Sequence, residues 1–371
     1  NIRMPSKYTV RTGASLSAQG HVERSTPLTV SSQYGVDVSF TSVELTMSLD
    51  DFSDRIIQPA MAQLAAKIES VCMQDAYKLV SNYTNGTTNS LITYNYFQKG
   101  GATLTNNLAP LSNRAAVMSP DSVVAFNDAV KGLFQDSSRI SKQYVEGMMG
   151  RTAGFDVFEN TLVPSHTTGT FAGTPLTTGA ALGTSATTNV WVSESDMDLD
   201  GITSGKTLLA GDIITFDGIY EVHPESKVNT GKLKTFVVQG DETAPAGGTM
   251  TVTVKPGVIY GSGNAYQNCT LSGVADTDGL TVSIIGTVNS QFKNDLQFHR
   301  DAFVFATADL EDVSQYGAWG ARDSMDGISM RIAKQYAISS DTVPCRVDVL
   351  FGFAGLYPEL ANRHMYETDL L

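Results

Sequence analysis

Hydrophobic and polar residues alternate along residues 36–40, and further on the pattern becomes helical. Apolar side chains occupy every second position of this first stretch, which is typical of a strand with one dry face. The alternation slips by one at Thr41 and resumes over 43–47, which indicates a bulge or a change of facing surface. From Asp50 to about Ser81 the apolar residues recur in steps of three and four and predict one stripe of an amphipathic helix: Phe52, Ile56, Ile57, Ala60, Leu64, Ile68 and Cys72.

The start of this long helix has its own signals. Ser48, with Asp51 three residues later, is a plausible N-cap pair, because their oxygen atoms accept from otherwise unpaired N–H groups. At 1.5 Å per residue, a helix over 50–81 is about 48 Å long. Pro59 lies inside it and lacks an N–H group, so we expect a kink or a new helix start there.

Residues 1–33 are polar and rich in turn residues, and they offer no hydrophobic face broad enough for a core. Residues 8–10 and 28–30 are candidate strands. We interpret the segment as an extended arm or hairpin that needs a partner surface; a frayed terminus is the alternative. Residues 81–90 are rich in Asn, Thr and Gly, and two short glycosylation-like patterns there are interpreted as turns.

Two stretches that contain both helix and strand patterns flank a long β-rich stretch. Residues 113–164 predict a strand, a helix with Pro120 at its first position and a returning strand at 155–159. From residue 298 to the end, strands are predicted at 302–305 and 346–351, with another apolar–polar run at 330–337.

Between these stretches, from residue 167 to about 290, every apolar run is short, β-branched and bounded by Gly, Asp or Asn. Such runs predict a β-barrel or sandwich: 213–216, 235–238, 250–254 and 280–284. The fold class is therefore α+β, with an all-β domain inserted into a unit made by the first and last thirds.

Composition excludes several classes of protein. With 42% hydrophobic residues, 16 Phe and 14 Tyr in 371 residues, the chain can bury a large core. No run of about 18 apolar residues exists, so no membrane span is predicted. The chain starts at Asn1 without Met or a signal-peptide pattern, so we expect that residues precede it or that it was processed. Three widely spaced cysteines indicate a reducing compartment: Cys72, Cys269 and Cys345.

A net charge of −13 argues against a protein that reads nucleic acid, because phosphate binding needs clustered Lys and Arg. The same charge is compatible with the lining of a container for nucleic acid, since a wall that weakly repels DNA lets the polymer slide.

Several stretches imitate chemical motifs. Residues 200–207 resemble a phosphate-binding loop, but Asp200 replaces the first glycine and Gly211 interrupts any following helix. Residues 196–201 imitate the start of a calcium loop without its bidentate Glu, and we interpret them as an acidic turn between strands. Asp50, Asp51 and Asp54 suit the first turn of a helix better than acid–base chemistry.

The five histidines show no metal-ligand spacing, and we interpret His223, which Pro224 follows, as a turn or packing residue. HExxH, CxxC and GxSxG motifs are absent. No catalytic residue, metal or cofactor is predicted.

Three stretches carry a resemblance to a known family. Residues 34–46 (Tyr-Gly-Val-Asp-Val-Ser-Phe-Thr-Ser-Val-Glu-Leu-Thr), running into residues 51–60, resemble the loop-to-spine-helix passage of tailed-phage major capsid proteins. Residues 209–220, continuing to 233, resemble the insertion domain of P22-type podovirus coat proteins. The ending, 346–352 with Tyr-Pro-Glu at 357–359, is similar to the closing strand of the same proteins.

The resemblance implies the Hong Kong 97 capsid fold and a major capsid protein that forms an icosahedral shell around double-stranded DNA. It implies an N-terminal arm and extended loop, a peripheral domain with the spine helix and a closing strand, a two-part axial domain and an inserted β-barrel domain. The expected arm and extended loop are residues 1–48, and the inserted β-barrel domain is 169–292. The peripheral domain is expected at 49–112 and 341–371, and the axial domain at 113–168 and 293–340.

The implied partners are many copies of the chain in hexamers and pentamers, a scaffolding protein, a portal at one vertex and packaged DNA without sequence-specific contact. No membrane partner is expected, and the implied location is the virion capsid, assembled in the bacterial cytoplasm. The placement of charges on the arm and first helical turn suggests candidates for contacts between subunits: Arg24, Asp37, Glu44, Asp54 and Arg55.

Two alternative functions remain at this point. The Thr- and Gly-rich β segment is also compatible with an exported bacterial surface or adhesin-type protein, which would need an export signal. A carbohydrate-active enzyme with a β accessory domain would need two carboxylates that converge in a cleft.

Overall fold

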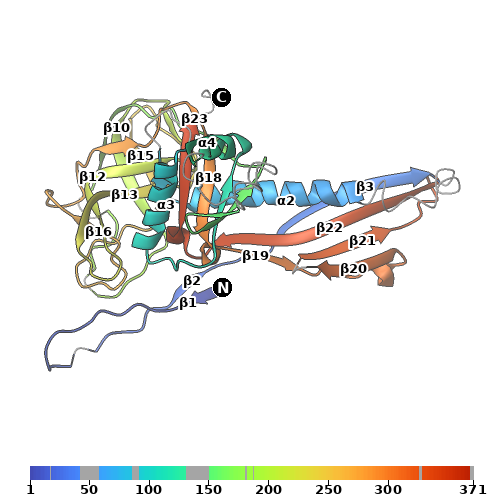
Figure 1. Cartoon of the computed structure of the whole chain (residues 1–371), viewed down its shortest axis with the longest axis horizontal. Coiled ribbons are helices and arrows are strands. Elements are labelled where there is room, and N and C mark those ends of the chain that lie inside the picture. The colour runs from blue at the N-terminus through green and yellow to red at the C-terminus, as the bar shows by residue number, and fades with distance from the viewer. Residues whose placement is uncertain are drawn as a thin grey trace. The chain divides into compact units, whose positions relative to one another are not determined.

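The fold is described by a computed structural model of the chain, which describes residues 1–16, 18–41, 58–85, 92–130, 150–179, 182–186, 188–325 and 328–367 (Figure 1). Strands make up 42% of the chain and helices 17%, so the fold is richer in β structure than an α+β class suggests. Two compact units divide the chain: unit 1 contains residues 1–2, 26–75 and 303–355, and unit 2 contains the remainder.

Unit 1 is built on a five-stranded antiparallel sheet. Figure 1 shows its longest strand, β22, lying between β3 on one side and β21 and β20 on the other. The strands are β3 (Ser32–Thr41), β19 (Phe303–Ala308), β20 (Trp319–Met325), β21 (Ile328–Lys334) and β22 (Thr342–Gly355). The strands predicted at 36–40 and 346–351 are therefore confirmed, and the one predicted at 302–305 begins at Phe303. Of the apolar–polar run at 330–337, residues 330–334 lie in β21.

The predicted long helix is confirmed over its described part, α2 (Gln58–Leu79). Its apolar stripe includes Leu64 and Ile68, which pack on Val347, Val349 and Phe351 of the sheet. The strand alternation supplies the matching apolar face, because every second residue of β22 points toward the helix. The predicted Ser48–Asp51 cap and the strand over 43–47 lie outside the described residues, and the kink at Pro59 stays a prediction.

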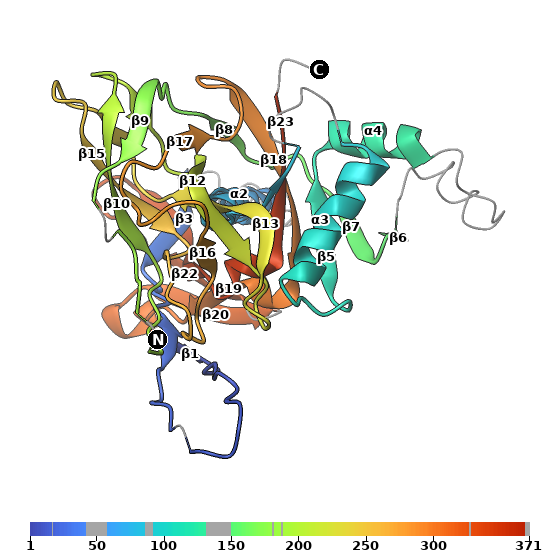
Figure 2. The ribbon, with the colours of Figure 1, turned by 90° about the vertical axis from the view of Figure 1, so that its left-hand side faces the viewer.

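The first sheet of unit 2 has seven strands, all drawn from residues 173–284 and all antiparallel (Figure 2). Its order is β16-β12-β13-β15-β10-β9, with β17 also paired to β12. Eighteen buried residues form its core, among them Phe216 and Phe236. The strands are β9 (Gly173–Thr177), β10 (Ser195–Ile202), β12 (Ile213–Val222), β13 (Asn229–Val238), β15 (Met250–Lys255), β16 (Cys269–Leu271) and β17 (Val282–Ile284).

The second sheet of unit 2 is mixed, in the order β4-β23-β18-β5-β7-β6 with β8 also paired to β18. Its strands are β4 (Tyr83–Thr84), β5 (Arg114–Met118), β6 (Arg151–Thr152), β7 (Phe155–Glu159), β8 (Ser165–Thr167), β18 (Gln291–His299) and β23 (Ala361–Glu367). Residues 115–118 and 155–159 were predicted as strands, and both are confirmed.

Two helices, α3 (Tyr94–Asn106) and α4 (Pro120–Val130), share a core with this second sheet (Figure 2). Phe97 of α3 lies 5.3 Å from Phe155 and 4.8 Å from Phe126 between ring centroids. Helix α4 begins at Pro120 as predicted. Helix α3, whose N-cap Thr93 accepts a hydrogen bond from the Tyr96 N–H, was not predicted from the sequence.

Some local predictions were wrong. Residues 8–10 and 28–30 are not strands; the paired strands near the N-terminus are β1 (Ile2–Met4) and β2 (Arg24–Thr26). Asn82, interpreted as a turn residue, is buried beside β4 and donates to the carbonyl oxygens of Glu359 and Ala361. The remaining short elements are β11 (Thr207–Leu208), β14 (Glu242–Thr243), η2 (Arg300–Ala302), η3 (Val313–Tyr316) and η4 (Pro358–Leu360).

Candidate assembly surfaces

Arg24 is the first predicted contact residue, and its side chain is only 9% exposed. Its guanidinium contacts Trp191, Tyr266 and Tyr357, and its Nη2 lies 3.7 Å from Oε1 of Glu359. Within one subunit this charge is therefore already engaged. A direct contact of Arg24 with a neighbouring subunit stays a prediction.

Asp37 lies on β3 with a side chain that is 78% exposed. Nε of Arg346 on β22 is 3.8 Å from its Oδ1, as expected from their opposite positions in the strand register. Arg346 and Arg331 also bind the buried Asp348, at 2.9 Å and 2.8 Å. The polar face of this sheet thus carries an ion-pair ladder across β3, β22 and β21.

Gly35 leaves room for this ladder. It lies opposite Asp348 in the register, where an added Cβ would be 2.5 Å from Oδ1 of Asp348 and 2.8 Å from the carbonyl oxygen of Val347. No ordinary side chain fits at such distances. The other three predicted contact residues, Glu44, Asp54 and Arg55, lie outside the described residues.

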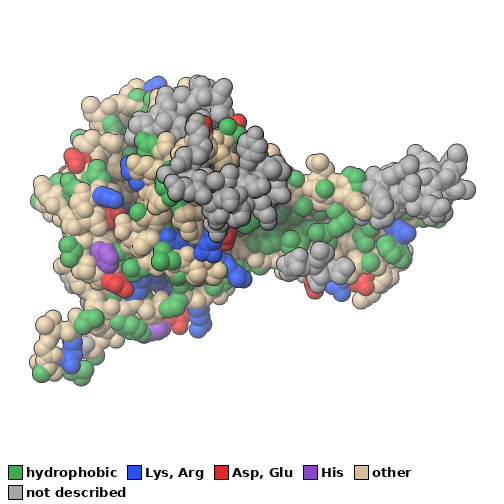
Figure 3. Space-filling model, viewed as in Figure 1, with side chains coloured by type: hydrophobic (Ala, Val, Ile, Leu, Met, Phe, Trp, Pro, Cys, Tyr) green, Lys and Arg blue, Asp and Glu red, His purple; other side chains and the backbone are tan. Residues whose placement is uncertain are grey.

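The segment between β1 and β2 carries unusually exposed apolar side chains, and we call residues 5–23 the arm. Val10 is 97% exposed, Leu16 88% and Tyr8 61%. Figure 3 shows hydrophobic side chains on this segment among polar ones. Most bonds inside the arm are exposed, for example from the Thr9 N–H to Oε1 of Gln19 at 2.8 Å, and the bond from the Ser6 hydroxyl to the Val22 carbonyl oxygen at 2.9 Å is partly buried. The arm therefore has no core of its own, as the sequence predicted.

The look-alike motifs have ordinary structural roles, and residues 200–207 form the end of β10, a turn and the start of β11. The stretch 196–201 lies within β10, so the predicted acidic turn was wrong; Asp196 and Asp198 accept from the hydroxyls of Thr253 and Thr251 on β15. His223 is a turn residue as predicted, because its Nδ1 accepts from the next backbone N–H groups. In the part of the chain that the structure describes, no group of His, Cys, Asp or Glu is arranged to hold a metal ion, and no helix is long and apolar enough to cross a membrane.

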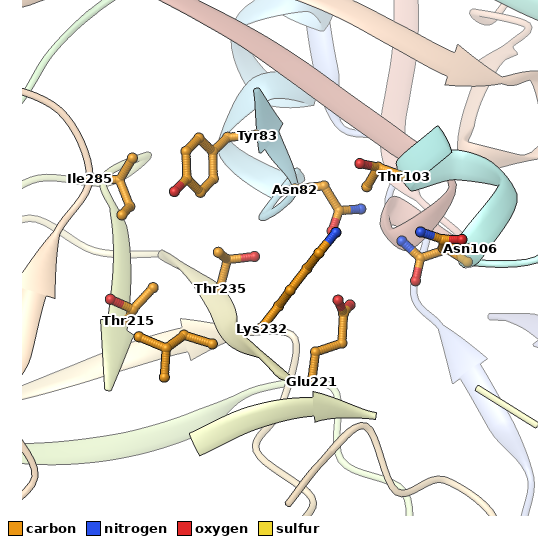
Figure 4. A pocket seen from close by; sticks show the side chains of 11 residues that line it. Asn82, Tyr83, Thr103, Asn106, Thr215, Glu221, Lys232, Thr235 and Ile285 are labelled. Atoms are coloured by element: carbon orange, nitrogen blue, oxygen red, sulfur yellow. The ribbon is translucent and has the colours of Figure 1, made fainter. Parts of the chain in front are cut away.

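A polar pocket with a volume of about 450 Å³ lies in unit 2 (Figure 4). Lys232 and Glu221 are its charged lining residues, and Oε1 of Glu221 is already paired with Nζ of Lys234 at 3.2 Å. The other lining residues bear amides, hydroxyls or apolar groups: Asn82, Tyr83, Thr103, Asn106, Asn107, Thr215, Leu233, Thr235 and Ile285. Among the described residues, no hydrogen bond joins a hydroxyl group of this lining to the side chain of Glu221 or Lys232, so the pocket supports no catalytic assignment.

Nearly the whole chain matches one protein family. The profile of the P22 coat protein, gene protein 5, aligns with residues 2–366. The chain belongs to the P22 coat protein family. It is a structural major capsid protein of a phage, it works as many copies in one assembly, and its location is the virion capsid. The adhesin and carbohydrate-active alternatives are not favoured.

Solved structures of phage capsids are similar to this coat protein. A structure of Mycobacterium phage Che8 is 10% identical, with a TM-score of 0.44 over 98% of this chain and 83% of that one. The mature capsid of bacteriophage PhiM1 gives 10% identity and a TM-score of 0.44 over 98% and 81%. The CUS-3 coat protein I-domain is 22% identical, with a TM-score of 0.20, and covers 33% of this chain and 100% of its own. No curated protein matches the chain.

Unit 2 of this coat protein buries two titratable side chains that the sequence does not predict. Asp295 on β18 and His364 on β23 lie opposite each other in the register, and both are fully buried. Burial raises the pKa of Asp295 to about 7, although bonds from Ser122 and Ser119 oppose the shift. Burial lowers the pKa of His364 to about 3. Their strands look like ordinary polar alternation in the sequence, which gives no sign that helices cover this face.

A second buried network joins the two sheets of unit 2. Oδ1 of Asp212 lies 2.8 Å from Nε2 of His166, within hydrogen-bond distance. Oδ2 of Asp212 accepts from the Leu209 N–H at 2.8 Å. Arg363 of β23 donates to the carbonyl oxygen of Gly211 at 2.7 Å. Tyr77 lies beside both, with its hydroxyl 3.3 Å from Nδ1 of His166 and its ring 5.8 Å from the Arg363 guanidinium. These contacts fix the start of β12 against β23.

Proposed function

We propose that many copies of this coat protein assemble into an icosahedral shell around double-stranded DNA, through contacts of the arm, the extended loop and the spine helix. In this proposal the chain has the Hong Kong 97 capsid fold. Residues 1–48 form the arm and extended loop, and 49–112 form the peripheral domain, to which 341–371 return. Residues 113–168 and 293–340 form the axial domain, and 169–292 are an inserted β domain.

The strongest support comes from the exposed apolar residues of the arm. Burial of apolar surface is the main driving force of protein association, and a side chain such as Val10, at 97% exposure, contributes nothing to the fold of its own subunit. A family of coat proteins has many identical neighbours available to cover it. We therefore assign the arm to contacts between subunits.

The remaining parts of the proposal come from the coat-protein family to which the chain belongs. The shell contains hexamers and pentamers, grows with a scaffolding protein in the bacterial cytoplasm, and carries a portal at one vertex. Its net charge of −13 suits a wall that lets packaged DNA slide without sequence-specific contacts. The protein needs no cofactor and acts as a structural protein, not an enzyme.

The test replaces two exposed arm residues together, Val10→Ser and Leu16→Ser. We expect the unfolding midpoint of the unassembled chain to stay unchanged and the yield of closed shells, counted by electron microscopy, to fall at least tenfold. The control is Val228→Ser, which removes a side chain that is 64% exposed between β12 and β13. Equal shell yields for the arm double variant and the parent would refute the role of the arm.

A further inference from the structure

The surroundings of Arg24 are those of a binding site for a guanidinium group. Three aromatic rings surround its guanidinium carbon, with ring centroids at 5.5 Å for Trp191, 5.9 Å for Tyr266 and 5.6 Å for Tyr357. All three distances lie within the range of cation–π attraction. The rings come from distant parts of unit 2: Trp191 precedes β10, Tyr266 precedes β16 and Tyr357 precedes η4.

Charge alone does not explain why Arg24 is held there. Glu359 is its ion-pair partner, at 3.7 Å, but two further cations lie close by. The pKa of Lys7 is lowered by burial and by the charge of Arg24. The pKa of Lys227 is lowered to about 8 by burial and by the charge of Lys7. Because Lys7 and Arg24 both lie in the field of Glu359, the three aromatic rings contribute to holding the guanidinium.

The same site also holds the two ends of the arm. The hydroxyl of Tyr266 donates to the carbonyl oxygen of Val22 at 3.0 Å and accepts from the Lys7 N–H at 3.1 Å. Val22 packs against a buried cluster that contains Tyr266, with Trp191 packed beside it. The side chain of Tyr266 therefore links the beginning and the end of the arm.

We propose that Trp191, Tyr266, Tyr357 and Glu359 form a guanidinium-binding cage, whose ligand is Arg24 of the chain's own N-terminal segment and whose role is to clasp the base of the arm. Arg suits this cage because its planar group stacks on rings and keeps its charge, whereas a lysine ammonium presents a compact, strongly hydrated charge. The clasp fixes the position from which the exposed arm residues are presented. This assembly role rests on the proposed function, but the cage itself does not.

The unassembled chain gives a direct test, because it has only two tryptophans. In a Trp319→Phe background Trp191 is the sole reporter, and acrylamide quenching measures its exposure. We expect Arg24→Ala to raise the quenching constant at least twofold and Arg24→Lys to give an intermediate value. The matched control is Arg11→Ala, since Arg11 lies on the same arm and, among the described residues, bonds locally to the Gly13 carbonyl oxygen.

Equal quenching constants for Arg24→Ala and its parent would overturn the cage. If Arg24→Ala does not fold, Tyr357→Leu removes one ring while Arg24 stays, and it must raise the quenching of Trp191 in the same way; unchanged quenching overturns the proposal. A change in both variants with normal shell yields would keep the cage and reject its role in assembly. The two proposals therefore fail separately.

The chemical class of the ligand is tested by adding a free cation to the folded Arg24→Ala variant. Methylguanidinium at millimolar concentration should lower the quenching of Trp191, while methylammonium at the same concentration should not. Identical effects of the two cations would show an ionic-strength response and reject selectivity for guanidinium.

Discussion

The two units of this coat protein bury a carboxylate in a central strand in opposite ways. Asp348 in unit 1 is fully buried and bound by two guanidiniums, those of Arg331 and Arg346. Asp295 in unit 2 is also fully buried, yet no described Lys or Arg lies within ion-pair distance of it, and it accepts from the Ser119 N–H at 2.9 Å. Burial raises the pKa of Asp295 to about 7.

The difference shows what a buried charge costs when its partners differ. Removing a carboxylate from water is expensive unless cations and hydrogen bonds replace the lost hydration. Unit 1 supplies one cation from the neighbouring strand, because Arg331 and Asp348 are opposite each other in the register, and a second from Arg346, two residues before Asp348 on the same strand. Unit 2 supplies mainly neutral donors, so Asp295 gains by binding a proton. Asp348 therefore stabilises unit 1 in its ionised form, and Asp295 stabilises unit 2 in its protonated form.

The first prediction applies one substitution to both aspartates. Asp348→Asn leaves two cations without their carboxylate and should lower the free energy of unfolding by about 3–5 kcal/mol, as expected for breaking a buried ion pair. Asp295→Asn at pH 8 should cost less than about 1 kcal/mol, because it keeps an acceptor for Ser119 and removes a poorly compensated charge. Urea unfolding at pH 8 measures both values, and equal losses would contradict the comparison.

The second prediction concerns pH. The folded pKa of Asp295, about 7, is above the value of about 3.9 expected in an unfolded chain, so the folded state binds the proton more tightly. Its contribution is therefore present below pH 4 and is lost as pH rises to 7, by up to about 4 kcal/mol. Asp295→Asn should abolish this downward slope in urea unfolding. A variant with the parent's slope would assign the pH dependence to other groups.

The third prediction concerns His364 and has the opposite sign. Its folded pKa of about 3 is below the unfolded value of about 6.5, so the unfolded chain binds more protons in that window. Its contribution is present above pH 6.5 and is lost as pH falls toward 3. Because the slopes of His364 and Asp295 oppose each other between pH 4 and 6.5, His364→Leu should make stability fall more steeply with rising pH than in the parent. If the free energy of unfolding of His364→Leu and of the parent changed with pH in the same way, the proposed opposition between His364 and Asp295 would be refuted.

The fourth prediction is smaller and concerns the space beside Asp348. Gly35→Ala places a Cβ 2.8 Å from a backbone oxygen, which forces a shift and should cost about 1–3 kcal/mol. Gly20→Ala is the control, because nothing lies within 4 Å of its Cβ position and its cost should be near zero. Equal unfolding midpoints for the two variants would show that the ladder tolerates a side chain.

The sequence predicts the elements whose hydrophobic period is unbroken. The alternation at Val36–Phe40 and the stripe through Leu64 and Ile68 depend on local spacing, and both appear as β3 and α2. Helix α3 was missed, because two glycines, Gly100 and Gly101, and several polar residues weaken its pattern. Its sheet contact supplies the stabilisation that the local sequence lacks.

The charged contacts are harder to predict than the elements. Arg24 was selected for its place on an extended arm, and its burial depends on Trp191, Tyr266 and Tyr357, which are far away in the sequence. The same is true of Asp348 in part: Arg346 lies two residues before it on the same strand, but Arg331 is identified only by the strand register. Tertiary pairing, which no local pattern encodes, decides the environment of each charge.

The central claim is that apolar surface of the arm stays uncovered until copies of the chain meet. Hydrogen exchange of the arm amides, compared between unassembled subunits and closed shells, tests it most directly. We predict at least tenfold slower exchange over residues 5–23 in shells, with little change in the strands β12 and β13. Closed shells whose arm amides exchange as fast as those of free subunits would contradict the claim.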